Sequence, residues 1–202
     1  SAGGEPGRGK HGDNIDRAVR FILSHSKSGM LTTEDTSHGP MYEHGICTLL
    51  LGEVLGMVNE ERPGYETIYR IHQGAVDLIL RAQCKRDRIS LGGWRYFPDS
   101  TDADISVTGW QLLALRAARD AGLPIPQKSI DQAILFVKRC AHPSGGFAYM
   151  AGGGFEPGIA RTGTGVLALQ ICGDFLSPEA RKGGDWLSKN PLEWKGPFFY
   201  YS

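Results

Sequence analysis

The sequence predicts an all-α protein built from stacked helical hairpins, and two observations carry this prediction. One helical pattern recurs along the 202 residues, as IDRAVRFIL at 15–23, HQGAVDLIL at 72–80, IDQAILFVK at 130–138 and, more weakly, ARKGGDWLSK at 180–189. A different, leucine-rich pattern lies between the copies, at 44–57, 108–123 and 162–176. A period of about 50–60 residues is typical of helical repeats, in which each unit buries its apolar face against the next.

The first pattern has the spacing of an amphipathic helix. In 15–23, apolar side chains recur at helical intervals, at Ile15, Ala18, Val19 and Ile22. The copy at 130–138 repeats this spacing with Ile130, Ala133, Ile134 and Val137. The other face carries charge, so we expect these segments to form an outer layer of helices with one buried face.

The leucine-rich pattern is expected to form an inner layer. Each copy begins with a polar residue followed by glycine, and the three pairs are His44-Gly45, Thr108-Gly109 and Thr162-Gly163. Leucine and alanine then occupy more than one face of the helix, as they do in helices that are buried nearly all round.

A glycine turn with an aromatic or large apolar residue follows each amphipathic segment. The turns are SGM at 28–30, GGWRY at 92–96, GGFAY at 145–149 and GPFFYY at 196–201. The two middle turns share the pattern Gly-Gly-aromatic-x-Tyr. We expect most of these rings to pack between helices, whereas Trp110, just inside the second leucine-rich segment, is expected to reach a ligand.

The composition excludes some classes of function. Lysine and arginine together number 22, as do aspartate and glutamate, so the chain as a whole has no electrostatic attraction for nucleic acid or an acidic membrane. The four cysteines are scattered, unlike a disulfide framework. The longest apolar run, 46–58, is too short to cross a bilayer and contains Glu53, so no transmembrane segment is expected. We expect residues 1–12 to be a flexible lead-in and 13–202 to be a single repeat domain.

The turns and paired helices resemble the terpenoid cyclase and protein prenyltransferase superfamily. Gln83 followed by Gly92-Gly93-Trp94 is similar to the glutamine-tryptophan repeat of squalene and hopene cyclases, with a longer spacing before the tryptophan. The resemblance covers about residues 13–201 and implies an α/α toroid of inner and outer helices. A complete toroid of that family has six hairpins, whereas four outer and three inner helices are expected here. The resemblance therefore implies a partial or open toroid.

An acidic motif opens the second leucine-rich segment. Class II cyclases of the resembled superfamily use a DxDD motif at this place to protonate an alkene or an epoxide. Here Asp102 and Asp104 match the first and middle acids, and Ile105 replaces the last one. The resemblance makes Asp102 and Asp104 the candidate catalytic residues, since proton donation needs a carboxyl group kept neutral in a dry cavity. The alternative is that Asp104 or Ser106 caps the helix.

Two other patterns point to cofactors but have simpler explanations. His44 and Cys47 lie three positions apart and, with Asp102 or Asp104, would offer zinc a set of nitrogen, sulfur and oxygen ligands. The zinc-binding prenyltransferases carry an Asp-x-Cys pair that this sequence lacks, so no metal is expected. TGTGVLA at 162–168 fits a dinucleotide fingerprint, but no strand is predicted before it, so close helix packing explains its glycines. No cofactor is expected.

If the hairpins stack in order, the starts of successive inner helices lie side by side at one rim of a central groove. The residues expected there are the candidate catalytic Asp102 and Asp104 and the candidate substrate-binding residues His44, Thr108, Trp110, Arg161 and Thr162. Arg161 is expected to bind a carboxylate or a phosphate, or else to form an ordinary salt bridge.

The sequence leaves three functions open. The first is a cyclase-like or prenyltransferase-like toroid domain that binds or transforms an isoprenoid or another elongated apolar molecule. The second is a non-catalytic helical-repeat module that binds another protein or the remaining domains of a longer chain. The third is a polysaccharide lyase on the same kind of toroid, for which Arg95 and Arg161 would be the basic residues.

Overall fold

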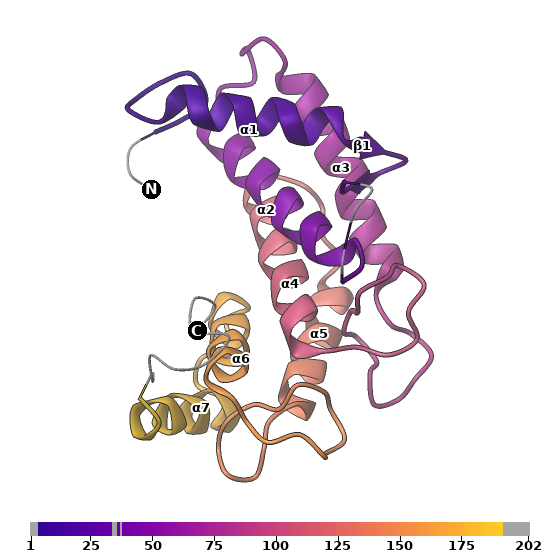
Figure 1. Ribbon diagram of the computed structural model, residues 1–202, viewed down its shortest axis with the longest axis vertical. Coiled ribbons are helices and arrows are strands. Elements are labelled where there is room, and N and C mark those ends of the chain that lie inside the picture. Colours follow the sequence, from indigo (N-terminus) through magenta and orange to yellow (C-terminus); the bar gives the residue numbers. More distant parts are fainter. Residues whose placement is uncertain (1–3, 34–35, 37, 192–202) are drawn as a thin grey trace. The chain divides into compact units, whose positions relative to one another are not determined.

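The described residues of the computed structural model form seven helices and one small sheet (Figure 1). The structure describes residues 4–33, 36 and 38–191. In chain order the elements are α1 (Gly12–Ser24), β1 (Ser26–Lys27), β2 (Met30–Leu31), α2 (Met41–Met57), α3 (Tyr65–Ala82), α4 (Ile105–Asp120), α5 (Gln127–Arg139), α6 (Ile159–Ile171) and α7 (Pro178–Lys189). The all-α prediction is therefore confirmed.

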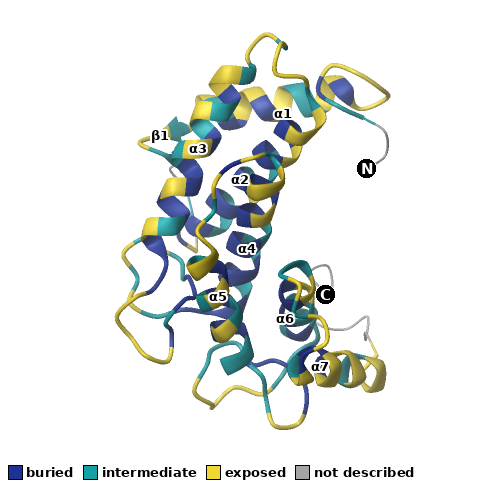
Figure 2. Cartoon of the chain, turned by 180° about the vertical axis from the view of Figure 1, so that it is seen from behind, coloured by how far each residue is buried: buried dark blue, intermediate teal, exposed yellow. Residues whose placement is uncertain are grey.

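Each helix corresponds to one predicted copy of a pattern. The amphipathic copies fall within α1, α3, α5 and α7, and the leucine-rich copies supply α2, α4 and α6. Helix α5 buries Ile130, Ala133, Phe136 and Val137 along one side, as its spacing predicts. Buried residues dominate α4, whereas exposed residues dominate α7 (Figure 2). Helix α6 differs from α4, because only Thr162, Gly165, Ala168 and Leu169 of α6 are buried by the described residues, so the expectation of burial nearly all round is wrong for this helix.

The leucine-rich helices α4 and α6 end earlier than the sequence suggests. The predicted ends at 123 and 176 are wrong, because Gly122 and Gly173 adopt φ values of 88° and 83° and stop each helix. The amides of Leu123 and Asp174 then bond carbonyls five residues back, at 2.9 and 2.8 Å. This is the geometry of a glycine C-cap, which satisfies carbonyls at the end of a helix.

The described residues group into two compact units. The first unit contains the described residues within 4–81, 96–98 and 113–125, and the second contains those within 82–95, 99–112 and 126–191. The core of the first unit is formed by apolar residues of α1, β2, α2 and α3, namely Val19, Ile22, Leu31, Leu51, Val54, Leu55, Ile68 and Ala75. The second unit centres on the buried rings of Trp94, Phe136 and Phe147.

The first turn, between α1 and α2, contains a two-residue hairpin. Strands β1 and β2 pair antiparallel, with Lys27 opposite Met30. Ser28 and Gly29 between them both have positive φ, 54° and 85°, as a tight hairpin turn of the right twist requires. Before α1, the Pro6 carbonyl accepts a hydrogen bond of 2.8 Å from Arg62, which ties the lead-in to the first unit.

No helix within the described ranges is both long enough and apolar enough to cross a membrane.

Candidate functional site

The fourth residue of each leucine-rich helix is polar and accepts a hydrogen bond from the segment of the glycine turn before it. The Trp94 amide donates to Thr108 Oγ1 at 3.0 Å, and the Phe147 amide donates to Thr162 Oγ1 at 3.0 Å. In the first hairpin, the Leu31 amide donates to Nδ1 of His44 at 3.1 Å. All three acceptors are fully buried. The same contact thus occurs three times, with histidine in place of threonine once.

His44 makes a second hydrogen bond that fixes its tautomer. Nδ1 must be an acceptor because the Leu31 amide points at it, so the proton lies on Nε2, which donates to the Ala75 carbonyl at 3.1 Å. Burial lowers the pKa of His44 to about 4, although the bond to Ala75 opposes this. The imidazole is therefore neutral at physiological pH and joins β2, α2 and α3.

The first glycine of each of the three described turns lies against the backbone of the next amphipathic helix, whereas the fourth turn, at 196–201, lies outside the described residues. At all three positions φ is positive, and an added Cβ would crowd a backbone carbonyl of that helix. The three contacts are Gly29 with Gly74 of α3, Gly92 with Gln132 of α5 and Gly145 with Lys182 of α7. Both the backbone conformation and the close approach require glycine here.

The tyrosine of the Gly-Gly-aromatic-x-Tyr pattern binds the preceding leucine-rich helix through its carbonyl. The Tyr96 carbonyl accepts from the Met41 amide at the start of α2, at 3.1 Å. The Tyr149 carbonyl accepts from the Ile105 amide at the start of α4, at 3.0 Å. Each bond satisfies a helix N-terminal amide that has no partner inside the helix. Each tyrosine carbonyl thus holds its turn to the start of a leucine-rich helix.

Gln83, the glutamine of the glutamine-tryptophan pattern, also forms a hydrogen bond to a glycine turn. Its buried side-chain amide donates to the Gly92 carbonyl at 2.9 Å and to the Ser129 carbonyl in α5 at 2.8 Å. The side chain thus joins the end of α3, the GGWRY turn and the start of α5.

Asp104 caps helix α4. Its Oδ1 accepts hydrogen bonds from the amides of Ser106 and Val107, both at 2.9 Å. Its own amide bonds the Trp94 carbonyl at 3.0 Å, which fixes the aspartate beside the turn. The side chain is fully buried. Of the two capping residues considered from the sequence, the cap is Asp104 and the structure shows no such role for Ser106.

Arg95 connects the two acids with a tyrosine. Its Nη1 lies 3.2 Å from Asp104 Oδ2 and its Nε lies 3.3 Å from Asp102 Oδ2. The same Nη1 donates to the Tyr149 hydroxyl at 3.0 Å, and the guanidinium lies 5.3 Å from the centre of that ring. Asp102 is half exposed, unlike Asp104. The structure brings Asp102 and Asp104 together, but it does so around an arginine.

Burial and hydrogen bonding have opposite effects on the Asp104 carboxyl group. Burial raises its pKa to about 6, and the Val107 amide, Arg95 and the Ser106 amide each oppose that rise. Loss of water is therefore the largest influence, because a buried charge is costly even beside a cation. Nearby, burial and then the Asp104 charge raise the pKa of Cys140 to about 12, so this thiol stays protonated.

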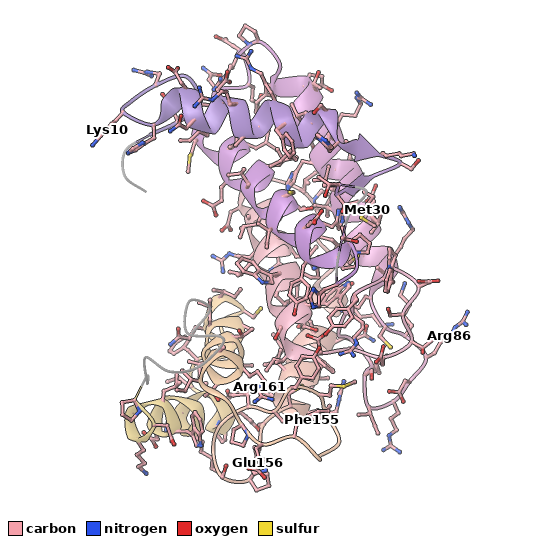
Figure 3. All side chains as sticks on the ribbon, viewed as in Figure 1. Lys10, Met30, Arg86, Phe155, Glu156 and Arg161 are labelled. Atoms are coloured by element: carbon pink, nitrogen blue, oxygen red, sulfur yellow. The ribbon has the colours of Figure 1, made fainter. Side chains whose placement is uncertain are left out.

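The remaining candidate residues lie on the same leucine-rich helices. Trp110 is partly buried in α4, and Arg161 is partly buried in the first turn of α6. The Arg161 guanidinium folds back over Gly158, in the loop that also carries Phe155 and Glu156 (Figure 3). Of the predicted site residues, His44 belongs to the first unit and the others to the second. The predicted meeting of His44 with the others stays a prediction.

The surroundings of Cys47 in α2 keep its thiol protonated. Burial, followed by the Glu43 charge, raises the pKa of the Cys47 thiol to about 11. Glu43 itself accepts hydrogen bonds from the Thr32 hydroxyl at 2.6 Å and the Thr33 amide at 3.0 Å. In the part of the chain that the structure describes, no three His, Cys, Asp or Glu side chains are grouped so as to hold a metal ion.

Sequence reasoning missed the connecting role of Arg95 and Tyr149. Both belong to the Gly-Gly-aromatic-x-Tyr turns, and that shared pattern was the available signal. The pattern does not predict that Arg95 from one turn pairs with Tyr149 from the next.

Comparisons with known proteins add no assignment: no family model matches this chain, and no curated protein matches it.

Proposed function

We propose that this chain is a helical-hairpin repeat domain of the terpenoid cyclase and prenyltransferase type, arranged as a partial or open α/α toroid. We further propose that it acts as a binding module whose acidic motif is structural. The observation that carries the proposal is that both carboxylate oxygens of Asp104 already have partners: Oδ1 caps α4 and Oδ2 meets Arg95.

The contacts of Asp104 are those of an anion. A proton donor has to direct a neutral O–H group at its substrate, whereas two backbone amides and a guanidinium all stabilise the ionised carboxylate. Ile105 stands where cyclases have a further acid, and it is fully buried. These features support a structural role for the motif.

The recurring turn contacts support a repeat domain. The buried acceptors His44, Thr108 and Thr162 take equivalent hydrogen bonds in successive hairpins. Residues that would line a substrate groove in the sequence-based account are here used to join turns to helices. Such an array presents extended surfaces on which a partner can bind.

The test is an assay with two isoprenoid probes, squalene and farnesyl diphosphate. Purified protein is incubated with each, and products and bound probe are measured by mass spectrometry. The proposal expects no product from either probe. Product formed by the wild-type chain and lost in Asp104→Asn, with unfolding unchanged, contradicts it.

A second candidate is acid catalysis at Asp104 on an apolar alkene. The observation in its favour is the raised pKa of Asp104, about 6, since a general acid has to hold its proton near the working pH. The same assay at pH 5.5 tests it, because the protonated fraction is larger there. For the lyase alternative, Nε and Nη1 of Arg95 already bind Asp102, Asp104 and Tyr149, so a sugar acid would have to displace one of these partners to bind the same nitrogens.

A further inference from the structure

Helix α6 comes close to α4 at Gly109. An added Cβ at Gly109 would overlap with the Thr164 side chain of α6. Gly109 directly follows Thr108, the residue that accepts the turn amide in α4. The glycine therefore provides a seat in which a threonine from the neighbouring leucine-rich helix fits.

The equivalent glycine on α6 is Gly163. Gly163 follows Thr162 as Gly109 follows Thr108, and Thr162 accepts the matching hydrogen bond from Phe147. Yet no atom of the described part of the chain lies within 4 Å of where a Cβ at Gly163 would be. Among the described residues, the repeat thus gives Gly109 a close neighbour and Gly163 none.

Apolar side chains continue from Gly163 along α6. Leu167 and Ile171 lie one and two helical turns further on, which puts them on the same face. Leu167 is 43% exposed, and Phe175 and Leu176 in the following loop are 57% and 63% exposed. That loop is fixed to α5 by an ion pair of 2.7 Å between Lys138 and Asp174.

Contiguous apolar surface marks an interaction site more often than a single exposed leucine does. We call the face of α6 formed by Gly163, Leu167 and Ile171 the α6 seat. We propose that the α6 seat binds the leucine-rich helix of a further hairpin of the same repeat type, with a threonine or a similarly small side chain over Gly163. This inference rests on the proposed function as a repeat binding module.

The choice of occupant follows from the contact that already exists in the chain. Thr164 of α6 lies over Gly109 of α4. A leucine-rich helix of the same type would make the equivalent contact over Gly163. The seat carries no charged side chain of its own, and the only charged residue within α6 is Arg161. An apolar helix therefore fits better than an acidic or basic peptide.

The test uses the full chain and a fluorescein-labelled peptide of residues 159–176 with Cys172→Ser. This peptide is the helix that already seats against Gly109, and it carries Thr164. Fluorescence anisotropy measures its binding to the wild-type protein and to Gly163→Leu, Leu167→Glu and Gly184→Leu. Gly184 is the matched control, because it is also a helical glycine with no described neighbour within 4 Å.

We expect saturable binding to wild type and to Gly184→Leu, and at least tenfold weaker binding to Gly163→Leu and Leu167→Glu. Thermal unfolding should be unchanged in all three variants, since none of the substituted positions is tightly packed. No binding to wild type, or equal binding to Gly163→Leu and Gly184→Leu, overturns the inference. So does a dimer of the chain that Gly163→Leu abolishes, because the occupant would then be a second copy. The isoprenoid assay does not depend on any of these results, so the two proposals can fail separately.

Discussion

The Trp94 amide donates its hydrogen bond to the Thr108 hydroxyl, fourteen positions away, and Phe147 and Thr162 repeat this pair in the next hairpin. In the first hairpin, a histidine ring nitrogen takes the place of the hydroxyl. The polar residue before each helix glycine thus has the same task throughout the described repeats, which is to hold the turn against the helix that follows.

Thr108→Val and Thr162→Val should each lower the free energy of unfolding by about 1–3 kcal/mol, because each leaves a buried backbone amide without its acceptor. Urea denaturation measures the loss. The control is Thr164→Val, whose hydroxyl bonds only the Ala160 carbonyl of its own helix and whose loss should be near zero. A Thr108→Val protein as stable as Thr164→Val would show that the turn contact is unimportant.

The stability of the protein should fall as the pH drops from about 6.5 to about 4. Burial lowers the pKa of His44 and of His72 to about 4, so the unfolded chain binds these protons more readily than the folded one does. The stabilisation is therefore complete above pH 6.5 and is lost as the pH approaches 4. Each histidine accounts for up to about 3 kcal/mol of this loss.

Asp104 acts in the opposite direction over a similar range. Its pKa is raised to about 6, so its contribution to stability is complete below its ordinary pKa of 3.8 and is lost as the pH rises through 6.

The variant His44→Gln tests the histidine contribution. Its free energy of unfolding, measured from pH 7.5 to 4.5, should decline less steeply with falling pH than that of wild type. His11→Gln is the control, because His11 is exposed. Equal pH dependence of both variants would contradict the buried neutral imidazole.

Arg95→Met should destabilise the protein by about 2–3 kcal/mol at pH 7.5, because it leaves the buried Asp104 carboxylate without its cation. The loss should shrink towards pH 5, where Asp104 can take up a proton. Arg116→Met removes an ion pair with Asp120 that is more than half exposed, so its effect should stay within about 0.5 kcal/mol. If the two variants unfold alike at both pH values, the Arg95 cluster is only a surface feature.

Gly92→Ala should be far more destabilising than Gly153→Ala. Both glycines have φ near +90°, so both substitutions carry the same backbone strain of about 1–2 kcal/mol. Only Gly92 also lies against the Gln132 backbone, whereas Gly153 has no described neighbour within 4 Å. Chemical denaturation of the pair separates strain from close packing. Similar losses would mean that α5 shifts to make room.

Much of the fold could be predicted from the sequence because helix periodicity is local. The alternation of the two helix types followed from the spacing of apolar residues in segments such as 15–23 and 130–138. The ends of α4 and α6 were less predictable, since Gly122 and Gly173 could either continue a helix or cap it. The first turn was expected only as a glycine turn, and its paired strands depend on Ser28 adopting a positive φ.

The candidate site was harder to predict because its contacts join distant segments. The motif placed Asp104 at a helix start, and the hydrogen bonds from Ser106 and Val107 show that it caps α4, which was the alternative to a catalytic role. Nothing local indicated that Arg95 would reach Tyr149, which lies 54 positions away. The sequence also did not predict that Thr108 and Thr162 accept hydrogen bonds from turn amides, because a buried hydroxyl can equally well face a ligand or a backbone amide.

The free energy of unfolding of Asp104→Ala, compared with that of Asp102→Ala at pH 7, tests the central claim most directly. Both acids match the cyclase motif, but only Asp104 caps α4 in a fully buried position. We predict a loss of about 2–4 kcal/mol for Asp104→Ala, from the cap and the buried charge pair, and less than about 1 kcal/mol for Asp102→Ala. If Asp104→Ala is as stable as wild type, the aspartate is not structural and the proposed role of the motif is wrong.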